Sequence, residues 1–193
     1  MGAETTALLD AARQGDQTAW DALVAQFTGL LWSIARSYRL DVADAHDVVQ
    51  MTWLRLVESL DRISDPERLG AWLATTARRE CLQLLRKAGR ERPSALETAL
   101  DDVPGSSEPV DAAMLLDERD RAVWRALVSI SERCQRLLRV LVASPPPAYK
   151  EVAAALDMPI GTIGPARQRC LDRLRHVIRS DAGLAAQLGG ELP

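Results

Sequence analysis

The sequence predicts an all-α protein built from two small helical domains that are joined by a flexible acidic linker. Apolar residues recur at helical spacing before and after the centre of the chain. Residues 93–109 between them contain three prolines, a Gly-Ser-Ser run and several acids, which is the composition of a linker. We therefore expect a first domain over residues 1–92, a linker over 93–110, a second domain over 111–180 and a fraying tail over 181–193.

Composition indicates a soluble globular protein. The chain has 193 residues, of which 47% are hydrophobic and 26% are charged. No apolar run reaches the roughly 20 residues needed to cross a bilayer, and the N-terminus lacks the pattern of a signal peptide. We therefore expect a cytoplasmic protein that has no contact with a membrane.

The three cysteines are expected to be small core residues. Cys81, Cys134 and Cys170 are widely separated, and each lies within an apolar helical pattern. This argues against a disulfide framework and against a CxxC metal site. A redox-sensing role is the alternative, and it has no support beyond the presence of the cysteines.

No motif indicates catalysis or a bound cofactor. The chain has no Gly-rich phosphate loop, no HExxH and no Ser or Cys in a nucleophile context. Asp44 and Asp47 lie one helical turn apart, but no histidine or second acidic pair is expected to converge on them. We therefore expect no catalytic residue, no cofactor and no metal ligand.

The net charge of −3 hides two cationic patches. Residues 78–92 carry five Arg and one Lys against two Glu, and residues 167–179 carry five Arg against one Asp, so each segment has a local charge of +4. Residues 97–120 carry eight acids against one Arg, a local charge of −7. This distribution favours nucleic-acid binding, whereas the average charge does not.

The first domain begins with two helices within residues 5–38, separated by a stop and cap at Gly15 and Asp16. The next helix, which Asp41 or Asp44 can cap, has a buried face that includes Val49, Trp53 and Leu56. Its other face is acidic and amide with two large apolar residues, and it comprises Asp47, Gln50, Met51, Leu54 and Glu58. That mixture favours docking on a partner; a simple solvated face is the alternative.

Residues 60–70 contain Asp-Pro and end in Gly, so they predict a loop before the last helix of the first domain. Leu73, Ala77, Cys81 and Leu84 form the core stripe of that helix. A second face carries an aromatic ring, hydroxyls and cations: Trp72, Thr75, Thr76, Arg79 and Gln83, flanked by Arg78, Arg86 and Lys87. Rings stack on unpaired bases and cations follow phosphates, so this face suits single-stranded DNA. Half-burial of Trp72 as a packing residue is the alternative.

The second domain ends in a helix-turn-helix pattern. A short Ala-rich helix over 149–156 is followed by the turn Asp157-Met158-Pro159 and by an Arg-rich helix over about 161–179. Pro165 is tolerated only in a first helical turn, which places the helix start near Gly161 or Thr162. The exposed face is expected to carry Arg167, Gln168, Arg169, Arg173 and Arg175, which favours DNA binding over an arginine-rich surface made for solubility.

Taken together, these segments resemble the bacterial extracytoplasmic-function (ECF) sigma factors, over residues 5–180. DAHDVVQMTWLRL is similar to the family's clamp-binding helix, AWLATTARRECLQLLR to its minus-ten helix, and ISERCQRLLRVLVASPPPAYKEVAAALDMPIGTI to its minus-thirty-five domain. The sequence departs from the family pattern at His46, where an acid is common, at Arg79, where many members carry Asn, and at Gly164-Pro165-Ala166-Arg167, where Lys-Ser-Arg-Leu is usual.

The resemblance implies a non-enzymatic sigma factor with sigma domains 2 and 4. Its implied partners are core RNA polymerase (beta-prime clamp and beta flap), promoter DNA in double- and single-stranded form, and an anti-sigma protein. The implied clamp-binding residues are Asp44, Asp47, Val48, Gln50, Met51 and Leu54. The implied minus-ten residues are Arg62, Asp65, Trp72, Thr75, Thr76, Arg78, Arg79, Gln83 and Arg86. The implied minus-thirty-five residues are Thr162, Gly164, Arg167, Gln168, Arg169, Arg173 and Arg175.

Two other classes remain open from the residues alone. A conventional helix-turn-helix regulator would use residues 1–92 as a ligand-binding or dimerisation domain and would bind a palindromic duplex by itself. An enzyme would use the acidic helix as a metal site and would show metal-dependent activity. The face around Trp72, which suits single-stranded DNA, favours the sigma factor over both.

Overall fold

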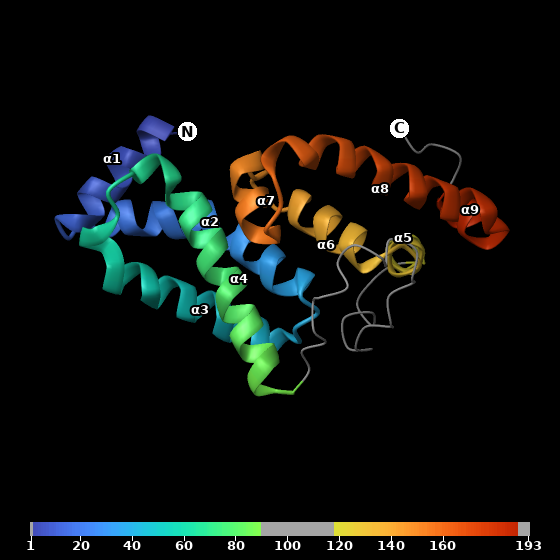
Figure 1. Ribbon diagram of the computed structural model, residues 1–193, viewed down its shortest axis with the longest axis horizontal. Coiled ribbons are helices and arrows are strands. Elements are labelled where there is room, and N and C mark those ends of the chain that lie inside the picture. Colours follow the sequence, from blue (N-terminus) through green and yellow to red (C-terminus); the bar gives the residue numbers. More distant parts are fainter. Residues whose placement is uncertain (1, 90–117, 189–193) are drawn as a thin grey trace. The chain divides into compact units, whose positions relative to one another are not determined.

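The computed structural model describes residues 2–89 and 118–188, and within these ranges every regular element is helical (Figure 1). The all-α prediction is confirmed. The elements are α1 (Gly2–Arg13), α2 (Gln17–Ser37), α3 (Val42–Ser59), η1 (Leu60–Arg62), η2 (Pro66–Arg68), α4 (Leu69–Lys87), α5 (Glu118–Val128), α6 (Glu132–Leu141), α7 (Tyr149–Leu156), α8 (Ile160–Ser180) and α9 (Ala182–Leu188). None of the helices described is long and apolar enough to span a membrane. The predicted linker, 93–110, lies outside the described residues.

The chain divides into two compact units. Residues 1–91 and Arg139–Ile160 belong to the first unit, and residues 92–138 and 161–193 belong to the second. The segment that contains α7, which the sequence assigns to the second domain, therefore packs with the helices of the first unit. The domain boundaries expected from the sequence stay a prediction.

Local sequence signals set the helix boundaries in the first unit. The Asp16 carboxylate accepts hydrogen bonds from the backbone N–H groups of Thr18 (2.8 Å) and Ala19 (3.2 Å), and Gly15 before it adopts a positive φ of 88°. Asp41 caps α3 in the same way, by accepting from the Asp44 N–H at 2.8 Å. The predicted cap at Asp16 is confirmed, and of the two alternatives for α3 the structure has Asp41.

The core of the first unit is formed by α2, α3 and α4, whose inner faces bury large aliphatic side chains. Leu31, Leu56 and Leu73 are fully buried, one from each helix. Each lies on a stripe that the sequence pattern predicts. Between α3 and α4 the expected loop forms two short 3₁₀ turns, η1 and η2, and α4 begins at Leu69. Because the core fixes the inner faces, the outer faces of α3 and α4 are available for other roles.

Helix α7 packs against α4 within the first unit. Glu151 of α7 is buried over Gly70, where an added Cβ would overlap the Glu151 carboxylate and the Phe27 ring. The carboxylate also accepts a hydrogen bond from the Ala148 N–H at 2.8 Å, which caps α7. Burial is the largest influence on Glu151, and it raises the pKa of the carboxyl group above its ordinary value of 4.5.

This raised pKa predicts a pH dependence of stability. The folded chain holds the Glu151 proton more tightly than the unfolded chain does, so the stabilising contribution is fully present below pH 4.5 and is lost as the pH rises through the folded-state pKa. Glu151→Gln keeps an acceptor for Ala148 and should remove this slope, while the exposed control Glu67→Gln should retain it. Urea denaturation at a series of pH values from 4.5 upward measures the free energy of unfolding of each variant. The same dependence of this free energy on pH in wild type and Glu151→Gln would contradict the prediction.

In the second unit, α5, α8 and α9 share a small apolar cluster. Its buried members are Ala122, Ala126, Ile178, Leu184 and Leu188, with Leu174 and Val177 packed against them. The last two buried leucines come from α9, so the expectation of a fraying tail is wrong for residues 182–188. The tail is rich in Gly and Ala, but Leu184 and Leu188 lie four residues apart and supply one apolar face.

A disulfide joins Cys134 of α6 to Cys170 of α8, with a Cα–Cα distance of 5.3 Å. The expectation that the cysteines form no disulfide is therefore wrong, although both are core residues as predicted. Their separation of 36 residues carries no pairing signal, and only the packing of the two helices brings them together. Cys81, in α4 of the first unit, is buried and takes no part in the disulfide.

Helix α8 begins at Ile160, slightly earlier than the sequence predicts, and Pro165 lies inside it. Pro165 therefore falls in the second helical turn rather than the first. It has no N–H to donate to the Gly161 carbonyl four residues earlier, which removes one hydrogen bond from this end of the helix. The N-terminal part of α8 is consequently held less firmly by its own backbone than the rest.

Candidate nucleic-acid interface

The outward face of α3 combines polar and large apolar side chains, as the sequence predicts. Asp47 and Gln50 are exposed, and beside them Met51 and Leu54 are 37% and 49% exposed. Val57, three residues after Leu54, is also exposed and extends the apolar part of this face. Val57 is absent from the set expected from the sequence, although its i+3 spacing from Leu54 is a detectable signal. We call Asp47, Gln50, Met51, Leu54 and Val57 the α3 face.

Two residues assigned to the clamp-binding set lie elsewhere on α3. Val48 is only 2% exposed, because the buried stripe of α3 also includes Ala45 and Thr52 and is wider than the sequence pattern indicates. Val48 therefore packs in the core and cannot contact a partner directly, which corrects its assignment. Asp44 lies in the first turn and is half-buried.

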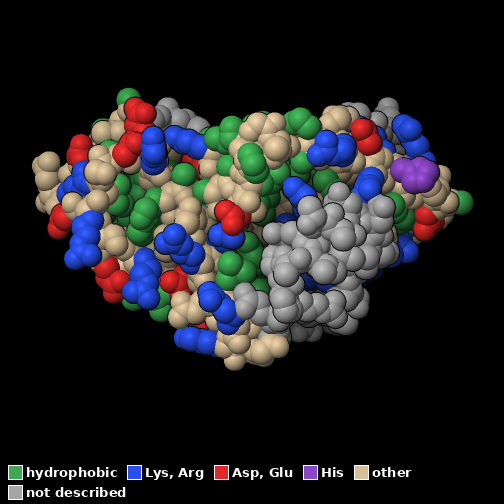
Figure 2. All heavy atoms as spheres, in the orientation of Figure 1, with side chains coloured by type: hydrophobic (Ala, Val, Ile, Leu, Met, Phe, Trp, Pro, Cys, Tyr) green, Lys and Arg blue, Asp and Glu red, His purple; other side chains and the backbone are tan. Residues whose placement is uncertain are grey.

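The second site runs along the outward side of α4. Residues spaced three and four apart place one aromatic ring, two hydroxyls, two cations and one amide on a continuous stripe: Trp72, Thr75, Thr76, Arg79, Gln83 and Arg86. The first three are half-buried, and the last three are exposed. We call these six residues the α4 face. In Figure 2, basic side chains are interspersed with acidic ones over the visible surface of the unit that contains α1 to α4.

The hydroxyl groups of the α4 face are engaged with the helix that carries them. Thr75 Oγ1 donates to the Ala71 carbonyl and Thr76 Oγ1 donates to the Trp72 carbonyl, each at 2.9 Å. These bonds fix the side-chain orientation and leave the oxygen lone pairs as acceptors. The face therefore presents a ring, fixed acceptors and cations side by side.

Arg78 lies beside the α4 face and is paired within the first unit. Its guanidinium contacts the Asp157 carboxylate at 2.6 Å. Asp157 ends α7 in a left-handed conformation with a φ of 55°. Of the residues before α4, Arg62 and Asp65 are exposed, and Asp65 pairs with Arg68 at 2.8 Å. Arg78 is thus a predicted minus-ten arginine that has a specific acidic partner in the structure.

The loop before α4 is held from α1 by Arg13, which the sequence analysis missed. Arg13 Nε donates to the Leu60 carbonyl at 3.1 Å, and a terminal nitrogen donates to the Ile63 carbonyl at 2.5 Å. The other terminal nitrogen pairs with Asp10 at 2.7 Å. One guanidinium therefore fixes the backbone on both sides of Arg62. No local sequence signal reveals it, because the partners are carbonyl groups about 50 residues away.

Arg13→Met is expected to loosen this loop without unfolding the unit. The methionine keeps an apolar stem but cannot donate to the two carbonyls, so amide hydrogen exchange across residues 61–66 should rise about tenfold and stability should fall by about 1–2 kcal/mol. Arg68→Met removes an exposed pair in the same loop and should cost less than about 0.5 kcal/mol. Unchanged exchange in Arg13→Met would show that other contacts hold the loop.

Arg55 joins α3 to α4. Its guanidinium contacts Glu58 on its own helix at 3.1 Å and Glu80 of α4 at 3.4 Å. The hydrogen bond to Glu58 and then the bond to Glu80 raise the pKa of Arg55 above its ordinary value. The pair with Glu80 spans α3 and α4, which pack against each other in the first unit.

The third site is the exposed side of α8. Thr162, Arg167, Gln168, Arg169 and Arg173 are exposed, and Gly164 and Arg175 are half-buried. Asp172 lies between these residues and accepts hydrogen bonds from Gln168 Nε2 at 3.1 Å and from Arg175 at 2.9 Å. A carboxylate therefore orients two of the predicted base-reading and phosphate-binding side chains.

Comparison with known proteins shows which family this chain resembles. The model of Sigma-70 region 2 matches residues 23–91, which include the α3 face and the α4 face. An ECF RNA polymerase sigma factor, SigE of Mycolicibacterium smegmatis, is 29% identical over 185 residues, covering 94% of this chain and 70% of the relative. The chain is therefore similar to the ECF sigma factors over most of its length.

One further relative and two solved structures are similar to this chain. The ECF RNA polymerase sigma-E factor of Escherichia coli is 28% identical to it over 165 residues, covering 81% of the chain and 84% of the relative. The fold is similar to that of CnrH, solved in complex with the cytosolic domain of CnrY, with a TM-score of 0.60, 24% identity and coverage of 93% and 99%. It is also similar to RpoE of Bartonella quintana, solved with the anti-sigma factor NepR, with a TM-score of 0.56, 24% identity and coverage of 84% and 98%. Sigma factors are transcription initiation factors rather than enzymes.

Proposed function

We propose that this sigma factor binds core RNA polymerase through the α3 face, holds the melted minus-ten strand on the α4 face and recognises the minus-thirty-five duplex with α8. The chain then directs the polymerase to promoters and catalyses no reaction itself. Its place of action is the cytoplasm, where polymerase and DNA are found. An anti-sigma protein is a further proposed partner.

The proposed contact of the α3 face is the beta-prime clamp. Asp47 and Gln50 would pair with basic and amide groups, while Met51 and Leu54 supply the apolar centre that interfaces use for affinity. Asp44, at the start of the same helix, would add a charge at the rim. The beta flap is proposed to bind the second domain.

On the α4 face, Trp72 is proposed to stack against an unpaired base, and Arg79 and Arg86 to follow the phosphates. Thr75, Thr76 and Gln83 offer acceptors and an amide to base edges. The loop with Arg62 and Asp65, braced by Arg13, would accept an extruded base. Arg78 would join this surface once Asp157 releases it.

Helix α8 is proposed to enter the major groove. Arg167 and Gln168 would contact base edges, and Arg169, Arg173 and Arg175 would hold phosphates. Thr162 and Gly164 lie near the start of the helix, where close approach to the backbone of DNA is expected. Asp172 would keep Gln168 and Arg175 oriented before DNA arrives.

One observation favours this proposal over the alternatives. The first unit carries an apolar-acidic face on α3 and an aromatic-cationic face on α4, and these two helices pack against each other. A regulator that binds only duplex DNA has no use for a surface suited to unpaired bases beside a protein-docking face. A sigma factor needs both together.

The test is gel filtration of the full chain with bacterial core RNA polymerase, followed by run-off transcription on genomic fragments. Co-elution at one-to-one stoichiometry with new start sites is the expected result. Absence of a complex, combined with tight binding of the isolated chain to a palindromic duplex, would instead support a conventional helix-turn-helix regulator.

A further inference from the structure

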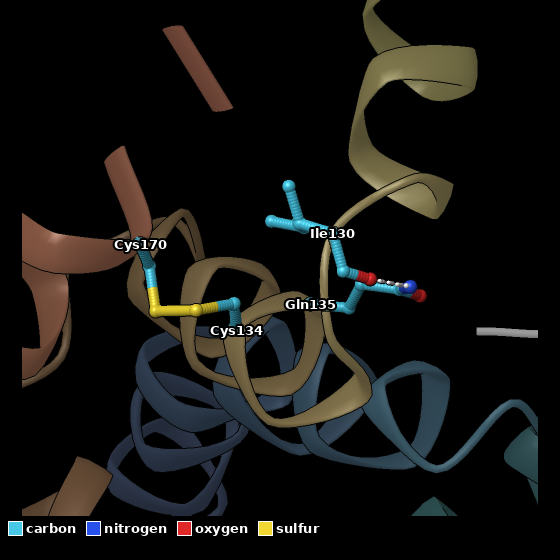
Figure 3. Close-up of a disulfide and its surroundings, with 4 residues drawn as sticks. All are labelled: Ile130, Cys134, Gln135 and Cys170. Atoms are coloured by element: carbon cyan, nitrogen blue, oxygen red, sulfur yellow. Dashed lines mark hydrogen bonds between the residues drawn. A yellow bond between two sulfur atoms is a disulfide. The ribbon is translucent and has the colours of Figure 1, made fainter. Parts of the chain in front are cut away.

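We propose that Cys134 and Cys170 form a reversible redox site whose oxidation state sets how firmly α8 is held in the second unit. The two sulfur atoms are bonded, and the residues that carry them are only 6% and 4% exposed. Figure 3 shows the bond running from α6 to α8. When reduced, the same positions would hold two buried thiols that pack as small apolar side chains.

The Cys134 end of the bond is anchored to a fixed turn. Gln135, the next residue, is buried, and its side-chain Nε2 donates to the carbonyl of Ile130 at 2.7 Å (Figure 3). The same nitrogen donates to the carbonyl of Val128 at 3.2 Å. These bonds hold the start of α6 against the end of α5. A covalent bond to Cys134 therefore ties α8 to a rigid part of the unit.

Cys170 lies between a half of α8 that packs in an apolar cluster and a half whose sequence weakens the helix. Beyond it, Leu174, Val177 and Ile178 pack in the cluster with α5 and α9. Before it, the helix contains Gly161, Gly164 and Pro165, which weaken a helix. Apart from the adjacent residues and the helix's own backbone, no described residue comes within 4 Å of a Cβ built at either glycine. The buried side chains of Ile163 and Ala166 hold this half by packing, and the disulfide adds the covalent link.

The two cysteines form a pair within the second unit. Cys81 belongs to the other unit, so the site is a defined pair rather than one of several exchanging cysteines.

The oxidant proposed is hydrogen peroxide and the reductant is a dithiol. One thiolate attacks the peroxide O–O bond, forms a sulfenic acid and releases hydroxide, which takes up the thiol's proton and becomes water. The second thiol attacks the sulfenic sulfur, the S–S bond forms and a second water leaves. Two thiols and one peroxide thus give one disulfide and two waters. A dithiol reverses the change by exchange and is itself oxidised to a disulfide.

The disulfide is expected to be reversible because the chain is proposed to act in the cytoplasm. This one step rests on the proposed function. Cytoplasmic disulfides are usually transient and redox-sensing, since cellular thiols keep cysteines reduced. A sigma factor beside polymerase and DNA would therefore carry the thiol pair in resting cells and the disulfide during oxidative stress. The chemistry of the pair does not depend on polymerase binding.

The test uses the full chain in three states: reduced with dithiothreitol, oxidised with hydrogen peroxide and reduced again without denaturant. Thiol titration should count three thiols, then one, then three, because the chain has 3 cysteines and Cys81 lies outside the disulfide. Peptide mapping should find a 134–170 cross-link. The oxidised chain should melt roughly 10 °C higher, and amide exchange over residues 161–169 should be slower.

Matched variants separate this site from general oxidation. Cys81→Ser should keep the full shift in melting temperature, whereas Cys134→Ser and Cys170→Ser should each abolish it. Equal melting of the oxidised and reduced wild type, cross-links that involve Cys81 or a second chain, or reduction that requires denaturant would overturn the proposal. Failure to bind polymerase would overturn the proposed function and leave these readouts unaffected.

Discussion

Leu54→Glu is expected to weaken binding to core RNA polymerase by about a hundredfold or more, because a carboxylate would be buried without a partner in the apolar centre of the contact. Leu54 is 49% exposed in the isolated chain, so the substitution should leave folding intact. Binding of a fluorescently labelled chain to core polymerase measures the effect, and circular dichroism checks the fold.

The matched control for Leu54→Glu is Val123→Glu, which places the same charge at an aliphatic residue that is 44% exposed on α5. It should bind polymerase like the wild type. If Leu54→Glu also bound normally, the α3 face would not be the docking surface. Equal losses in both variants would point to a general effect of added negative charge.

Trp72→Ala is expected to reduce the fraction of open promoter complexes by about 5- to 150-fold, since stacking of one base on an aromatic ring contributes about 1–3 kcal/mol. Polymerase binding should be unchanged, because the α3 face is intact. Permanganate footprinting of the minus-ten region measures strand opening, and polymerase binding is measured in parallel.

Half-burial of Trp72 requires a second variant, because the alanine also loses packing. Trp72→Phe retains a ring for stacking and most of the buried surface, and it should restore most of the opening. A Trp72→Ala chain that opens promoters normally would remove Trp72 from the DNA-binding surface. A loss of opening that followed thermal stability alone in both variants would assign Trp72 to packing.

Features encoded within a few residues were predictable from the sequence. Asp16 and Asp41 are capping residues immediately before apolar stripes, and both caps form. The stripes of α3 and α4 separate a buried from an exposed face, so the exposure of Asp47 and Arg79 could be predicted from spacing alone. The roles of these residues in binding stay predictions.

Features that depend on distant packing could not be predicted. Cys134 and Cys170 meet only because α6 packs on α8, and Arg13 recognises carbonyl groups whose position no side chain reveals. The family motif assigns Val48 to the clamp-binding residues, but the buried stripe of α3 is wide enough to include it, so Val48 lies in the core. Each of these cases requires the tertiary arrangement.

The arginine–aspartate pairs also affect how DNA binding depends on ionic strength. Arg78 and Arg175 already contact Asp157 and Asp172 in the protein without DNA, so each carries an internal counterion. When a phosphate replaces that carboxylate, one anion is exchanged for another, and fewer salt ions are released from the complex than the number of arginines indicates. These two arginines would therefore contribute orientation at the promoter more than they contribute salt-sensitive affinity.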